Sequence, residues 1–210
     1  MSFFVENTSG SYERCPAGVH LARCYSIIDL GTQKNEFIVG QIKFLHKIRF
    51  TWEVHVTSEE NKPLLMKDGR PYSIHKEYTL SWNEKATMRL DLQSWRGKPF
   101  NDTEMRKFDL KTILGVWCQL NIIDRAGKKD GTIYANVDSI TPVPSFVKAN
   151  GLPEGINPIE IFNISDPDMK LFESFSDYIK NKIKASPEWG RRGDVDTVTS
   201  SAEIEDDIPF

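Results

Sequence analysis

The sequence predicts a mainly β fold, in which a small barrel of five strands carries one helix between its third and fourth strands. The first observation behind this prediction is the alternation of apolar and polar residues from Ile42 to Val56, the period-two pattern of a strand with one buried face. The second is a change to a helical period after residue 80. The third is a change of character after Pro144, where Gly and Pro replace the strand pattern.

The first three strands precede the helical pattern. In chain order we expect a loose arm (1–16), a first strand (19–30), a polar turn (31–40), a second strand (42–56), a turn region (59–71) and a third strand (72–80). The second strand is long, so we expect it to be bent or bulged, as strands of small barrels are. Its even positions form the apolar face, and Trp52 on that face is expected in the core.

Asn83 is expected to cap the helix, and Gly97 to end it. The remaining elements are a short apolar turn (108–114), a fourth strand (116–123), a hairpin loop (124–131) and a fifth strand (132–140). This order fits the five-stranded Greek-key barrel known as the OB-fold, although other small β-barrels share it.

The chain after Pro144 is predicted to form a strap, a helix and a tether. Residues 145–164 are extended, and Asp166-Pro167 is expected to begin an amphipathic helix. That helix either packs on the barrel or serves as a dimerisation face. Residues 186–202 have no apolar period and predict a flexible tether. We therefore divide the chain into a barrel with its N-terminal arm (1–144), a strap and helix (145–185), and a tether with an acidic tail (186–210).

Composition and motifs restrict the function classes. No run of 18 apolar residues and no signal peptide is present, and three cysteines without C-x-x-C spacing fit reduced thiols in the cytoplasm. The four histidines are scattered and no catalytic motif occurs, so we expect no enzyme, no metal and no cofactor. A nuclease that binds metal through Asp29, Asp91 and Asp109 is the enzymatic alternative.

The C-terminus combines four acids with an apolar end. The net charge of the chain is −3, and because Glu203, Glu205, Asp206 and Asp207 are the only charged residues after position 200, residues 1–200 carry +1. Such an end buries nothing by itself. A partner could hold it by placing Phe210 in an apolar pocket and the carboxylates against Arg or Lys. The predicted partner-binding residues are Glu205, Asp206, Asp207, Ile208, Pro209 and Phe210.

This ending resembles the tail of bacterial single-stranded DNA-binding proteins. The body differs from the bacterial domain, and segments such as Tyr78–Ser81, Leu92–Gly97 and Tyr134–Val137 are similar to phage and mobile-element proteins of the same kind. The resemblance implies an OB-fold, coating of exposed single strands in DNA replication, recombination and repair, and recruitment of nucleases, helicases or polymerase components by the tail. It also implies a cytoplasmic location in a bacterial host and, for this body, a monomer or homodimer.

Binding of single strands needs cations for the phosphates and aromatic rings for the bases. The polar face of the second strand carries Lys43, Lys47 and Arg49, and the predicted hairpin loop carries Lys128 and Lys129. The helix and its end add Arg89, Trp95, Arg96 and Lys98. Stacking candidates are Tyr72, Trp82 and Tyr134, and each of these, like Trp95, could instead be core. Nothing in the pattern reads base sequence, so binding is expected to be sequence-independent and salt-dependent.

Three further hypotheses remain open. The tail could lie in the basic groove of its own body and compete with DNA, because its tether gives it a high effective concentration. The chain could instead be an interaction protein that occupies host replication factors and has no DNA affinity. It could also anneal complementary strands in recombination.

Overall fold

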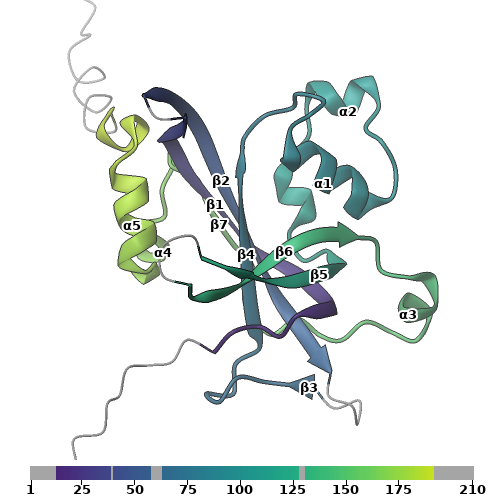
Figure 1. Cartoon of the computed structure of the whole chain (residues 1–210). Coiled ribbons are helices and arrows are strands. Elements are labelled where there is room, and N and C mark those ends of the chain that lie inside the picture. Colours follow the sequence, from purple (N-terminus) through teal and green to yellow (C-terminus); the bar gives the residue numbers. More distant parts are fainter. Residues whose placement is uncertain (1–12, 39, 58–62, 128–130, 192–210) are drawn as a thin grey trace, which may run out of the picture.

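The computed structural model describes residues 13–38, 40–57, 63–127 and 131–191, and these form a mainly β fold with short helices (Figure 1). In chain order the elements are β1 (Gly18–Ile38), β2 (Gln41–Thr57), β3 (Pro63–Leu64), β4 (Tyr72–Thr79), α1 (Thr87–Arg96), α2 (Asp102–Arg106), the 3₁₀ helix η1 (Leu110–Ile113), β5 (Trp117–Ala126), β6 (Ile133–Thr141), α3 (Ser145–Ala149), β7 (Glu160–Phe162), α4 (Met169–Ser174) and α5 (Asp177–Lys184).

The strands form one sheet along the path β3-β2-β1-β5-β6, with β4 also paired to β2 and β7 paired in parallel to β1. All other pairs are antiparallel. Within the described residues no ladder joins β4 to β6, so the sheet is open at these edges.

β1 and β2 form a long antiparallel pair, and β1, which has bulges, also pairs with β5 and with β7. The register shifts between Cys24 and Ser26 and again between Asp29 and Gly31. Such bulges bend a strand and increase its twist. The turn predicted from Gly31 is wrong, because β1 continues to Ile38. Gly31 lies within the strand with a φ of +67°, and a Cβ there would lie 2.6 Å from the side chain of Ser186.

The main core lies on the even-numbered face of β2, as the alternation predicts. Phe50, Trp52 and Val54 are at most 1% exposed. They pack with residues of β1, β4, β5 and β6 and with one face of α1. α1 begins at Thr87 rather than at the predicted Asn83, whose Oδ1 instead accepts a hydrogen bond from the N–H of Lys85 in the preceding turn. It ends at Gly97 in the left-handed conformation, as predicted.

The C-terminal segment builds a second core on the opposite face of β1. Ile28 and Leu30 of β1 pack there with Phe162 of β7 and with Phe172 and Ile183 of α4 and α5. The helix expected from Asp166-Pro167 is two helices, because the backbone at Phe175 is extended, and the N-cap is Asp168. This segment therefore packs on the sheet of its own chain.

Candidate nucleic-acid interface

A polar groove lies between the first half of β2, the end of β4 and the segment that leads to α1. Its volume is about 680 Å³. Its lining consists of lysines, hydroxyl and amide side chains, one carboxylate and two further side chains: Lys43, Lys47, Lys85, Thr79, Ser81, Thr87, Asn83, Glu77, Tyr78 and Ala86. These groups suit phosphate and sugar oxygens, which are bound through Lys, Ser, Thr and Asn side chains.

The register of β2 and β4 places the groove lysines. Lys43 and Lys47 are four positions apart and therefore share a face of β2. Lys47 pairs with Thr79 across the sheet, and its Nζ donates a hydrogen bond of 2.9 Å to Thr79 Oγ1. Lys43 lies further along the arm of the β1–β2 hairpin and is exposed. The two ammonium groups are thus presented from a rigid strand rather than from a loop.

α5 brings a further cation, Lys182, into contact with Glu77, a lining residue of the groove. Lys182 Nζ lies 2.6 Å from Glu77 Oε2, and both side chains are about three-quarters buried. Burial acts to lower the pKa of Lys182, but its interactions with Glu77 and Tyr178 together outweigh this and raise the pKa. Burial lowers the pKa of Lys47, and Glu77 opposes that change. Glu77 is the only acid among the described lining residues, so the cations outnumber it.

Arg49 is the third cation predicted on this face of β2, after Lys43 and Lys47, but it lies where the face is covered. It is half-buried, and its cross-strand neighbours are Glu77 on β4 and Ile28 on β1. Because Ile28 belongs to the second core, this part of the face runs beneath the C-terminal segment.

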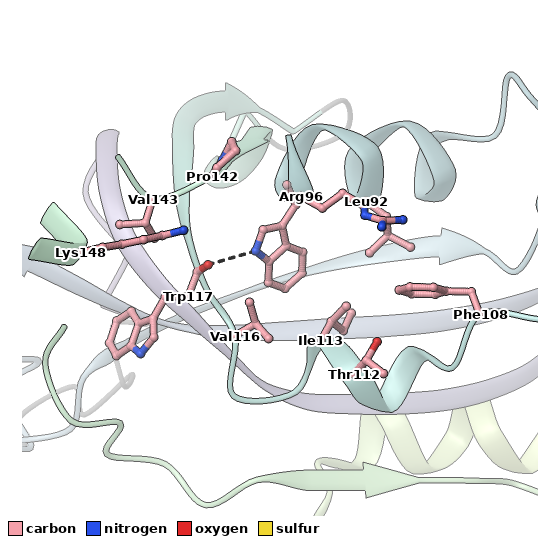
Figure 2. A pocket seen from close by; sticks show the side chains of 11 residues that line it. Leu92, Arg96, Phe108, Thr112, Ile113, Val116, Trp117, Pro142, Val143 and Lys148 are labelled. Atoms are coloured by element: carbon pink, nitrogen blue, oxygen red, sulfur yellow. Dashed lines mark hydrogen bonds between the residues drawn. The ribbon is translucent and has the colours of Figure 1, made fainter. Parts of the chain in front are cut away.

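Trp95 and Arg96 line a different hollow, an apolar pocket of about 310 Å³ beside α1 (Figure 2). The Trp95 indole is 5% exposed and its Nε1–H donates to the carbonyl of Trp117 at 3.1 Å. Arg96 pairs with Glu104 at 2.5 Å and its Cζ lies 4.4 Å from the ring centroid of Phe100. A buried, hydrogen-bonded indole offers no face to a base, so Trp95 is core here and not a stacking residue.

Three further predicted residues have structural partners. Tyr72 is 8% exposed and its hydroxyl donates to Glu13. Trp82 is half-buried with its ring against Phe100 and Phe108, and Arg89 donates to the Trp82 carbonyl. Tyr72 is therefore also excluded as a stacking residue, and Trp82 and Arg89 stabilise the segment that bounds the groove.

Of the remaining candidates, Lys98 is exposed beyond the end of α1, and Tyr134 on β6 is 50% exposed. Lys128, Lys129 and the predicted tail residues lie outside the described part of the chain.

Sequence reasoning missed Lys85, Lys182 and Tyr178. Tyr178 counts toward the apolar face in the sequence pattern, yet it is 59% exposed. The signal was present: Ile179 and Ile183 are four positions apart and define the buried stripe of α5, and Tyr178 and Lys182 form a second stripe with the same spacing.

Other chemistry is not assembled in the described residues. No group of three or more His, Cys, Asp or Glu side chains there could hold a metal ion, and none of the helices there is long and apolar enough to span a membrane. The cysteines are free and buried, and burial raises the pKa of Cys15 to about 12. No protein-family model and no curated protein matches the sequence.

Proposed function

We propose that this chain binds single-stranded DNA without sequence preference, with the β2–β4 groove as the phosphate site. The observation that carries the proposal is the groove itself. Lys43, Lys47 and Lys85 converge there with hydroxyl and amide groups, and Glu77 is already paired with Lys182. Clustered cations at a hollow raise the local concentration of a polyanion.

The pairing of the strands supports an OB-type barrel as the scaffold. β1 pairs with both β2 and β5, β2 pairs with β4, and α1 lies between β4 and β5. In an OB-fold, which is a partly open barrel, the face of strands two and three binds oligonucleotides. Counted without the two-residue β3, these strands are β2 and β4, and the groove lies on them.

The test is a titration of the full chain with labelled oligo-dT at two salt concentrations, with double-stranded DNA as competitor. If three phosphates are neutralised, affinity should fall about 20-fold between roughly 50 and 200 mM salt. Replacing Lys43 and Lys47 by Gln should weaken binding and reduce the salt slope by about 1.4. The matched control replaces Lys111 and Lys148, which are exposed and outside the groove.

Two results would contradict the proposal. The first is absence of any oligo-dT signal at low salt, which favours an interaction protein without DNA affinity. The second is an equal effect of the two double substitutions, which places the phosphates outside the groove.

For the acidic end we propose recruitment of replication and repair proteins, on the sequence of residues 205–210 alone. When each chain is coated on oligo-dT, the full-length chain should pull down more of the bacterial replication proteins than the chain without Phe210. Equal pull-down by the two chains would contradict the proposal.

A further inference from the structure

α5 is fixed on the sheet beside the groove. Ile179 and Ile183 are buried against Ile28 and Leu30 of β1. At the helix end, Gln33 Nε2 donates to the carbonyl of Lys182 at 2.9 Å. The outward stripe of α5 is thus held in a defined place.

Tyr178 and Lys182 make up that outward stripe, and contacts connect them to the groove. Lys182 Nζ lies 4.9 Å from the Tyr178 ring centroid and also contacts Glu77, which lines the groove. Glu77 in turn acts electrostatically on Lys47. Tyr178 is therefore at the margin of the phosphate site and not on a remote surface.

The exposed ring has the chemistry of a base platform. A tyrosine ring stacks on any base, since every base has a π-face. With 59% of Tyr178 exposed, ring surface remains available although Lys182 contacts one part of it. Among the rings predicted for stacking, Trp95 and Tyr72 are buried and the Trp82 ring packs on Phe100 and Phe108, so Tyr178 is a more exposed ring than these three.

We propose that α5 is a wall of the DNA site, in which Tyr178 stacks on a base while Lys182 contacts a neighbouring phosphate. This inference rests on the proposed function, because it adds a base contact to the same phosphate groove. It also makes the C-terminal segment part of the binding surface.

The experiment compares the full chain with its Tyr178→Ala and Tyr178→Phe variants on oligo-dT and on an abasic strand of equal length. Tyr178→Ala should weaken oligo-dT binding by about five-fold to 100-fold, while Tyr178→Phe retains the ring and should bind like the parent. The abasic strand has nothing to stack, so its affinity should be the same for all three chains. Phe146→Ala is the matched control, because Phe146 is 70% exposed on α3 and outside the groove.

The outcomes separate the two proposals. If the parent chain binds no oligo-dT, the proposed function fails and this inference falls with it. If the parent binds oligo-dT and Tyr178→Ala binds it equally well, stacking by Tyr178 is refuted while the phosphate groove stands. The same holds if Tyr178→Ala lowers the affinity for oligo-dT and for the abasic strand by the same factor.

Discussion

Gln has nearly the shape of Glu, yet replacing Glu53 by Gln should strongly destabilise this chain. Glu53 lies on β2 with its side chain fully buried. It accepts hydrogen bonds from Arg23 Nε at 2.8 Å and from the backbone N–H groups of Ile156 and Asn157 at 3.0 and 2.7 Å. Arg23, whose side chain is 12% exposed, also donates to the Asn157 carbonyl. One carboxylate thus joins the sheet to the C-terminal strap.

The magnitude follows from what Gln leaves behind. Its amide group would direct N–H donors at N–H donors of the strap, and the Arg23 charge would remain buried without its counter-charge. Breaking a buried pair in this way costs about 3–5 kcal/mol. For a chain of this size that corresponds to a fall in Tm of about 6–20 °C.

The pH dependence gives a second signature. Burial acts to raise the pKa of Glu53, but the hydrogen bonds from Arg23 and residues 156–157 outweigh it and lower the pKa below its ordinary value of 4.5. A lowered folded-state pKa means that the stabilisation is present above about pH 4.5 and is lost as pH falls through the folded-state pKa. The difference in unfolding free energy between the parent chain and Glu53→Gln should therefore become smaller at acidic pH.

The assay is urea unfolding followed by tryptophan fluorescence at neutral and acidic pH. Glu84→Gln is the control, because Glu84 is exposed and surface substitutions usually change stability by less than about 0.5 kcal/mol. Two results would refute the reasoning. One is a loss of unfolding free energy for Glu53→Gln as small as that of the control, and the other is a loss that does not change with pH.

Two further predictions concern the Arg23–Glu53 pair and the Glu77–Lys182 pair. Gly155→Ala should lower Tm substantially, because its Cβ would lie 1.8 Å from Arg23 Cζ and force that side chain away from Glu53; an unchanged melting curve would contradict this. Glu77→Gln should strengthen oligo-dT binding, because it removes the carboxylate that neutralises Lys182 in the groove; weaker binding, without loss of stability, would show that Glu77 positions the lysines instead.

The sequence predicts the strand pattern well where one face of a strand is buried. The even residues of β2 from Ile48 to Val54 are core, as expected. Phe44 shows the same alternation and is 67% exposed, because β2 continues there into the hairpin arm, away from the core. The alternation predicts a strand with one apolar and one polar face, but it does not predict at which residue the neighbouring strands end and the apolar face becomes exposed. The turn expected at Gly31 fails for a related reason, since the φ of +67° and the close approach of Ser186, 155 positions later, explain a glycine inside β1.

The candidate site is predictable only where it is local. Lys43 and Lys47 follow from the period of one strand, whereas Lys182 reaches the groove through packing of α5 on β1, 135 positions later in the chain than Lys47. Trp95 illustrates the opposite case. The sequence leaves it open between core and stacking, and its burial is decided by contacts distant in sequence, among them the hydrogen bond of its Nε1–H to the Trp117 carbonyl of β5.

The docking of the C-terminal segment decides how far the groove extends. The polar face of β2 is expected to carry a phosphate site at Lys43, Lys47 and Arg49. Beyond Arg49 this face is covered, since Thr51 is 8% exposed and the Glu53 side chain is fully buried. Beside them, Ile28 and Leu30 of β1 are buried by the C-terminal segment. Under the proposed function, a DNA strand that follows β2 from Lys43 would leave it near Lys47, where Ser81 and Lys85 line the groove. Lys182 of α5 pairs there with the lining residue Glu77 and contacts the Tyr178 ring, which would place this ring near the bases of the strand.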